Sequence, residues 1–175
     1  MRKLLFESLI KSPFTEAPPS ESTAALVELA ASVERAAHRR LGRSLSIREV
    51  DAGSCNGCEL EIHALNNVFY DLERLGLCFV ASPRHADVLL VTGPVTKNMR
   101  EALERTYNAT PDPKWVVAVG DCAVDGGIFA ESYAVTGGVS KVVPVDLHIR
   151  GCPPSPLQLL EGLFALLESD KRLGS

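Results

Sequence analysis

The spacing of apolar residues changes along the chain. From Thr23 to Leu41 apolar residues recur at steps of three and four, with charged residues between them, and this spacing predicts an amphipathic helix. Gly42 is expected to end that helix, because glycine readily adopts the left-handed conformation that follows many helices. Beyond residue 42, short apolar runs alternate with stretches of helical spacing. The pattern therefore predicts strands separated by helices.

Five strands and three further helices are expected in this second part of the chain. The predicted strands cover residues 46–50, 77–81, 86–92, 115–120 and 142–147. The predicted helices cover residues 59–75, 97–107 and 156–168, with apolar stripes that are expected to face the core. Strands that alternate with helices need crossover connections, which favour a parallel sheet covered by helices on both faces. The sequence thus predicts one α/β domain.

The first 22 residues differ from this domain. Residues 12–22 include three prolines and are typical of an extended linker. Residues 1–11 carry a short apolar helical face, too short to be stable alone in water, which consists of Leu4, Leu5, Phe6, Leu9 and Ile10. We therefore expect an N-terminal extension over residues 1–22 and a domain over 23–175. The extension is expected to be disordered, or to pack on its own domain, a partner subunit or a membrane surface.

Composition and charge exclude several classes of protein. The 175 residues are 46% hydrophobic and 23% charged, which is ordinary for a globular domain and unlike a disordered or collagen-like chain. The net charge is −4 and the basic residues are scattered, so we expect no nucleic-acid partner. No apolar stretch approaches the roughly 18 to 20 residues of a membrane-spanning helix.

The positions of the cysteines indicate a site. Five cysteines, an odd number, in a chain without an export signal indicate reduced thiols rather than a disulfide framework. Cys55 and Cys58 follow the first predicted strand, while Cys122 and Cys152 each follow a later one. Ligands of open parallel sheets bind beyond the carboxyl ends of the strands, so these four thiols can converge there. Cys78 lies inside an apolar strand and is expected to be a buried small hydrophobe.

Four converging thiols fit several kinds of site. Structural zinc usually takes two close pairs of cysteines in a small domain that the metal itself folds, whereas this chain has one close pair and a core of its own. A redox dithiol at Cys55 and Cys58 would leave Cys122 and Cys152 unexplained. An iron–sulfur cluster, most simply [4Fe–4S], accepts ligands that are remote in sequence. The spacing favours the cluster, with zinc, a dithiol and inert cysteines as alternatives.

The motifs around the cysteines resemble those of a known family. They are Cys55-Asn56-Gly57-Cys58-Glu59-Leu60-Glu61, residues 82–93, Gly120-Asp121-Cys122 with Gly126-Gly127, and Gly151-Cys152-Pro153-Pro154. In this order they resemble the small subunit of energy-converting, membrane-associated [NiFe] hydrogenases of the formate hydrogenlyase type, and the related 20 kDa iron–sulfur subunit of complex I. The spacing of Cys55 and Cys58 follows the hydrogenase pattern, since complex I subunits are expected to have adjacent cysteines there.

The resemblance implies a flavodoxin-like domain that holds one [4Fe–4S] cluster through Cys55, Cys58, Cys122 and Cys152. It further implies an electron-transfer subunit of a hydrogenase complex. Electrons would pass between the nickel–iron site of a large subunit and ferredoxin-like iron–sulfur subunits. Integral membrane subunits of the complex would hold this chain, as a peripheral subunit, on the cytoplasmic side of the cell membrane. The alternatives are a complex I type subunit with quinone as acceptor, and a standalone zinc or dithiol protein.

Two carboxylates follow the first cysteine pair directly. Glu59 or Glu61 is a candidate for carrying protons near the active site, since a carboxylate shielded from water can hold a proton near neutral pH. The alternative is that the carboxylate only stabilises the first turn of the helix that starts here, through the helix dipole.

Several residues depart from the family pattern. Arg150 stands where proline is more frequent, and Asp121, Val124 and Asp125 are not the residues expected around Cys122. These departures leave the four cysteines intact. Asp146 is expected to orient the loop that carries the last of them.

Overall fold

A computed structural model describes residues 22–169 of the chain. Its centre is a parallel five-stranded sheet made of β1 (Leu45–Asp51), β2 (Leu77–Phe79), β3 (Val88–Thr92), β5 (Trp115–Val119) and β7 (Leu147–Ile149). The strands lie side by side in the order β2-β1-β3-β5-β7. Counted along the chain, this is the order 2-1-3-4-5 that is typical of flavodoxin-like folds. The predicted fold class is therefore confirmed, whereas the predicted extension lies almost entirely outside the described residues.

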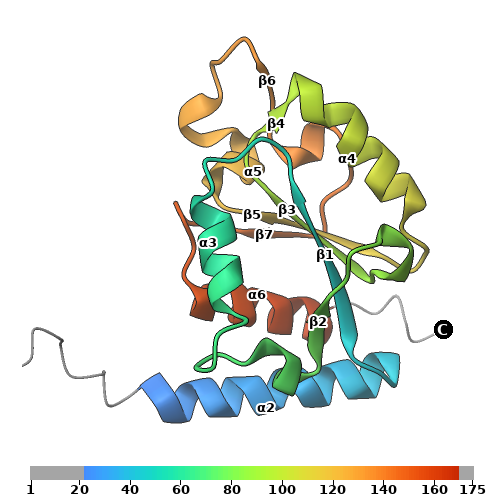
Figure 1. Cartoon of the computed structure of the whole chain (residues 1–175), viewed down its shortest axis with the longest axis vertical. Coiled ribbons are helices and arrows are strands. Elements are labelled where there is room, and N and C mark those ends of the chain that lie inside the picture. The colour runs from blue at the N-terminus through green and yellow to red at the C-terminus, as the bar shows by residue number, and fades with distance from the viewer. Residues whose placement is uncertain (1–21, 170–175) are drawn as a thin grey trace, which may run out of the picture.

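Helices cover both faces of this sheet (Figure 1). One face carries α3 (Gly57–Ala64) and α6 (Pro156–Ser169), and the other carries α4 (Lys97–Ala109) and α5 (Asp121–Asp125). Helix α2 (Ser22–Leu41) packs on the outside of α6 and adds a further layer. A small antiparallel pair, β4 (Val95–Thr96) and β6 (Val135–Gly137), lies apart from the main sheet. Between residues 22 and 169, no helix combines the length and apolarity needed to cross a lipid bilayer.

The central strands are buried on both sides. In β3, Val88 and Leu90 pack in the core beneath α6, while Leu89 and Val91 pack in the core beneath α4. Strand β5 repeats this alternation, and every side chain of both strands is buried. Parallel strands with helices on both faces need such unbroken apolar runs, and for this reason both strands are recognisable in the sequence.

Most other predicted elements are confirmed within two residues at each end. Helix α2 ends at the expected glycine: the φ angle of Gly42 is +64°, and its N–H donates to the carbonyl of His38 at 3.1 Å. Short 3-10 helices, which the spacing of apolar residues does not predict, form η1 to η4 at Leu72–Leu75, Pro83–His85, Gly127–Phe129 and Val139–Lys141.

The predicted helix over residues 59–75 is wrong in its second half. Helix α3 ends at Ala64, and a turn separates it from the short helix η1. The side-chain oxygen of Asn67 accepts hydrogen bonds from the N–H groups of Phe69 at 2.8 Å and Tyr70 at 3.0 Å, which stabilises a turn in place of the helix. Val68 and Phe69 were expected in the core, but they are 99% and 54% exposed.

The predicted strand over residues 142–147 is also wrong, because β7 spans Leu147–Ile149. Asp146 sets where this strand begins. Its N–H donates to the carbonyl of Val116, and its carboxylate accepts from the N–H of Val116, both at 2.8 Å. The apolar residues before it belong partly to a turn, from which Val143 packs against the core beneath α4. These residues are apolar because they pack against the core, and not because they pair in a strand.

Candidate functional site

The carboxyl ends of four strands lie in one row across the sheet. Asp51 of β1 is opposite Thr92 of β3, Thr92 is opposite Val119 of β5, and Val119 is opposite Ile149 of β7. Three of these strands lead within four residues to a cysteine, Cys55, Cys122 or Cys152 in chain order. Parallel pairing therefore brings three remote segments to one rim, as predicted from the order of the elements.

The four thiols lie close enough to influence one another's ionisation. Burial is the largest of the effects that raise the pKa of Cys58 to about 12, followed by the charges of Glu59, Cys55, Cys122 and Cys152. Burial also raises the pKa of Cys122, and the charges of Cys152 and Cys55 add to this effect. Thiolates are unfavourable in such a place unless a cationic group binds them.

Glycine backbone lies directly against two of the sulfurs. A Cβ atom at Gly120, whose φ is +85°, would lie 2.6 Å from the Sγ of Cys58. A Cβ atom at Gly127, whose φ is +49°, would lie 2.9 Å from the Sγ of Cys122. Only glycine fits at either position, because a side chain would occupy the space of the thiol. A bulky inorganic group could therefore approach main chain at this rim.

Backbone hydrogen bonds tie the segment of Cys122 to the segment of Cys152. The N–H of Gly120 donates to the carbonyl of Ile149 at 2.8 Å, and the N–H of Asp121 donates to the carbonyl of Gly151 at 3.0 Å. In return, the N–H of Gly151 donates to the Oδ1 of Asp121 at 3.2 Å. These two cysteine segments are thus held in one register.

The loop after Cys152 also reaches the first cysteine pair. Pro153 comes within 4.0 Å of the position that a Cβ atom would take at Gly57, and the Sγ of Cys55 lies 3.6 Å from that position. All three cysteine segments therefore meet around one small region of the rim.

The backbone near Cys122 affects the ionisation of its thiol. The backbone of Ile128 lowers the pKa of Cys122, against the larger effect of burial, which raises it. N–H groups close to cysteine sulfur stabilise the thiolate and tune the potential of iron–sulfur centres.

The two predicted carboxylates occupy different environments. Glu59 is 6% exposed, and neither of its carboxylate oxygens has a hydrogen-bond partner among the described residues. It lies in the first turn of α3, whereas Glu61 is half-buried further along that helix. The two side chains therefore differ in their access to water.

The sequence analysis missed Glu49, a strand residue near Glu59. Burial raises the pKa of Glu49, the charge of His63 opposes this, and the charges of Glu59 and Asp51 add to it. The only signal in the sequence was a charged side chain at a strand position that faces α3.

Other polar residues singled out from the sequence lie away from this rim. Cys78 pairs in register with Ser46, far from the end of β1, and it is half-buried rather than fully buried. Arg84 and His85, which belong to the motif of residues 82–93, precede β3, so they lie toward the opposite rim, where both are exposed. Asp146 anchors the start of β7, at the other end of that strand from the cysteine loop.

Two kinds of metal centre place different demands on these thiols. Among residues 22–169, no three His, Cys, Asp or Glu side chains are grouped so as to hold a single metal ion. A zinc ion takes its sulfurs at about 2.3 Å, and in a [4Fe–4S] cluster each thiolate binds a different iron. The glycines beside the sulfurs of Cys58 and Cys122 suit a bulky group of the second kind.

Comparison with known proteins identifies the family of the chain. The family described as NADH ubiquinone oxidoreductase, 20 Kd subunit, matches residues 55–166. Formate hydrogenlyase subunit 7 of Escherichia coli (strain K12) is 47% identical over 139 residues, which are 79% of this chain and 54% of that protein. The probable membrane-bound hydrogenase subunit mbhJ of Pyrococcus furiosus is 47% identical over 128 residues, 73% of this chain and 77% of that protein.

Two solved structures are similar as well. A chain of the membrane-bound sulfane sulfur reductase, an archaeal respiratory membrane complex, is 36% identical with a TM-score of 0.65, over 78% of this chain and 74% of that one. A chain of the [NiFeSe]-hydrogenase of Dm. baculatum, 21% identical with a TM-score of 0.53 over 72% of this chain and 63% of that one, shares the fold alone. The chain spans about half the length of its E. coli relative. Relatives of this kind are subunits of oxidoreductase complexes, and the match over most of the domain shows that the chain belongs to the NADH ubiquinone oxidoreductase 20 kDa subunit family.

Proposed function

We propose that this chain is the electron-transfer small subunit of a multi-subunit [NiFe] hydrogenase and holds one [4Fe–4S] cluster through Cys55, Cys58, Cys122 and Cys152. One observation carries the proposal: three strand ends in a single row bring four thiols to one rim. The names of two relatives, a formate hydrogenlyase subunit and a probable membrane-bound hydrogenase subunit, support it. Such a cluster supplies one-electron transfer.

The residues of the rim would bind the cluster and set its surroundings. Gly120 and Gly127 would let it approach the main chain, and the backbone of Ile128 would stabilise the thiolate of Cys122. Half-buried Cys58, with a thiol pKa of about 12, must release its proton when iron binds. Loading of the site should therefore release protons and be favoured at higher pH.

A partner subunit would cover this rim. Large apolar side chains are exposed on the segments that carry the cysteines, namely Leu60, Ile128, Phe129 and Leu157. Apolar side chains exposed together mark interaction surfaces. The proposed partner is the large subunit with the nickel–iron centre, and electrons would pass from or to ferredoxin-like subunits. Integral membrane subunits of the complex would hold this chain, as a peripheral subunit, on the cytoplasmic side of the membrane.

Metal analysis of the anaerobically purified complex tests the proposal. We expect acid-labile sulfide with iron in slight excess over it, because the nickel–iron centre adds iron without sulfide. We also expect a brown colour and an electron paramagnetic resonance signal on reduction that is assigned to this chain. Serine at any of the four positions 55, 58, 122 and 152 should abolish or alter that signal, while the matched variant Cys78→Ser should leave it unchanged. Zinc without sulfide would contradict the proposal and favour the zinc alternative.

Glu59 and Glu61 are the candidates for proton transfer beside the cluster. The buried, unpartnered carboxylate of Glu59 supports that residue, although its place in the first turn of α3 also suits helix stabilisation. Each should be changed singly to glutamine in the complex. Slower hydrogen turnover and proton exchange with full iron content would support proton transfer. Unchanged rates in both variants would remove it and leave the helix role.

The family description, which names NADH ubiquinone oxidoreductase, favours a second candidate function as a complex I type subunit with quinone as the acceptor. The two residues between Cys55 and Cys58 support the hydrogenase type instead. Assays of the complex separate the two candidates: hydrogen-dependent reduction of a viologen dye is expected for the hydrogenase type. Quinone reduction without any hydrogen activity would favour the complex I type.

A further inference from the structure

A cavity opens at the edge of the sheet beside β1. Strand β2 pairs with β1 only from Leu45 to Ile47, whereas β1 continues to Asp51. Beyond Ile47, none of the described strands covers this side of β1. The space that remains is a cavity of about 250 Å³ between the end of β1, the carboxyl-terminal part of α3 and the segment 79–81. A cavity of this size has room for several water molecules.

The lining of this cavity includes two groups that can bind and release protons. They are the carboxylate of Glu49 on β1 and the imidazole of His63 on α3. Glu49 is half-buried, whereas His63 and the nearby lining residue Asn66 are exposed. Ile62 and Phe79 add apolar wall. The cavity is thus open to solvent beside the histidine and has a carboxylate deeper inside.

Two buried polar atoms of the lining have no protein partner. The Oε1 of Glu49 and the Nε of Arg48 are buried, and neither has a hydrogen-bond partner among residues 22–169. Buried polar atoms are usually hydrogen-bonded, either to protein or to ordered water. Since both residues line the cavity, water inside it is the partner that can satisfy them. The same water would join Glu49 to His63 and to the solvent.

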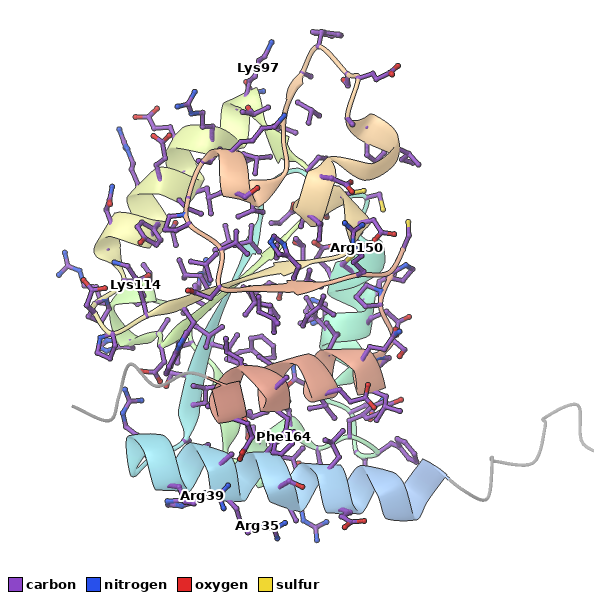
Figure 2. The ribbon with its side chains drawn as sticks, turned by 180° about the vertical axis from the view of Figure 1, so that it is seen from behind. Arg35, Arg39, Lys97, Lys114, Arg150 and Phe164 are labelled. Atoms are coloured by element: carbon purple, nitrogen blue, oxygen red, sulfur yellow. The ribbon has the colours of Figure 1, made fainter. Side chains whose placement is uncertain are left out.

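The cavity shares a helix and a strand with the cysteine segments. His63 follows Cys58 by five residues on α3, which is about 7–8 Å along a helix axis. Glu49 lies two residues before the end of β1, from which the loop with Cys55 starts. In Figure 2, sulfur atoms lie beyond the end of α3 on the side of the molecule that carries Arg150. Protons that enter the cavity therefore arrive close to the proposed cluster.

We propose that this cavity is a proton-exchange site of the complex, in which His63 and Glu49 pass protons through water between the solvent and the interior. The inference rests on the proposed function, because hydrogen chemistry consumes or releases protons and electrons in equal number. A ring nitrogen of His63 gives a proton to cavity water, and the water gives one to the carboxylate of Glu49. Glu49 becomes an anion again when it passes the proton on toward the large subunit. No electron moves in these steps, and proton release reverses them.

The charges around Glu49 suit this role. Burial has the largest effect on the pKa of Glu49 and raises it, and the charge of His63 comes next and lowers it. The charges of Glu59 and Asp51 raise this pKa, and that of Arg48 lowers it. Strands β2 and β3 beside it carry no charged side chain. A carboxylate with a raised pKa holds a proton at a pH at which an exposed carboxylate has lost it.

Separate variants test the two groups and the water. Glu49→Gln and His63→Gln remove the groups that carry the proton and keep side chains of similar size. Ala81→Leu keeps both groups but fills part of the cavity, since Ala81 lines it. The matched controls Glu101→Gln on α4 and His38→Gln on α2 change exposed side chains on other elements. Each variant is purified as the complex, and its iron and sulfide contents are measured first.

Hydrogen turnover and the exchange of hydrogen gas with solvent deuterium are then measured. Positioned proton carriers contribute about 10²–10⁴-fold to rates, so we expect both rates to fall at least about tenfold in Glu49→Gln. His63→Gln and Ala81→Leu should also be slower, and both controls should be unchanged. Reduction of the cluster by a dye should keep its rate in every variant, because the path of the electrons is intact.

Chemical rescue separates proton transfer from a structural role. Added acetate should restore part of the rate of Glu49→Gln, and added imidazole should restore part of the rate of His63→Gln. Small acids of this kind carry the proton in place of the missing side chain, whereas they do not repair a distorted fold. Neither compound should change the rates of the two controls.

Two failures are distinguishable. Rates equal to the controls in fully loaded Glu49→Gln and His63→Gln would overturn this inference and leave the proposed function standing. Slower rates that come with loss of iron, and that neither acetate nor imidazole restores, would also overturn it, because they would indicate a structural role. Absence of iron and sulfide from the unmodified complex would overturn the proposed function itself.

Discussion

Replacing Gly120 with alanine should expel the cluster. The φ and ψ angles of Gly120 are +85° and 155°, a region that essentially only glycine occupies. Forcing another residue there costs on the order of 1–3 kcal/mol. In addition, the new methyl group would lie 2.6 Å from the Sγ of Cys58. The backbone strain and the steric clash both act beside the sulfur of Cys58.

The displacement of the Cys58 sulfur can be estimated by comparison with Gly57. A Cβ atom at Gly57 would lie 3.6 Å from the Sγ of Cys55, which is ordinary contact, and Gly57 has no positive φ angle. The Cys58 sulfur would have to move by about 1 Å to reach a similar separation, beyond the tolerance of about 0.5 Å within which a site works. The backbone strain alone should lower the melting temperature by roughly 2–4 °C per kcal/mol.

The assay measures iron, acid-labile sulfide and the melting temperature of the complex with Gly120→Ala or the matched control Gly57→Ala. We expect strong loss of iron and a lower melting temperature in the first variant, and nearly full iron content in the second. Equal, full iron contents in both variants would refute the reasoning, because the Gly120 backbone would then not need to lie against the thiol of Cys58.

Three further experiments test a buried carboxylate, a half-buried thiol and the broken helix. Asp87→Ala should lower the free energy of unfolding in urea by about 1–3 kcal/mol, because Asp87 is 7% exposed and accepts from a buried N–H and an arginine. In the cluster-free chain near pH 9, Cys58 should react with iodoacetamide more slowly than Cys152 and speed up only as the pH approaches its thiol pKa of about 12; equal rates would contradict this. Leu65→Ala should lower the free energy of unfolding by about 2–5 kcal/mol, and Val68→Ala should lower it by less than about 0.5 kcal/mol. Similar losses in the two variants would favour the continuous helix expected over residues 59–75.

The parts of the fold that the sequence predicted well are those in which burial is continuous. Strands β3 and β5 are buried along their whole length, so their apolar runs distinguish them from helices and exposed strands. Their alternation with helices then predicts parallel pairing. The convergence of Cys55, Cys122 and Cys152 follows from that pairing, because the ends of parallel strands share one rim.

The wrong predictions share a different cause. Apolar residues at 65, 68, 69 and 72 fit a helix, but the side chain of Asn67 supplies hydrogen bonds that stabilise a turn. The valines before β7 fit a strand, but β7 begins only where Asp146 pairs with Val116. In both places a specific polar contact outweighs the spacing of apolar residues, and spacing carries no information about such contacts.

By itself, the sequence determined the class of fold, the strand ends that carry the cysteines and the family, because burial and short motifs are properties of neighbouring positions. The tertiary structure alone decided which charged residues lie near one another: Arg150 near Asp121 and Asp125, and Glu49 near Glu59. The physical reason is that these contacts depend on the order and register of the strands. Residues remote in sequence become neighbours only when the sheet has formed.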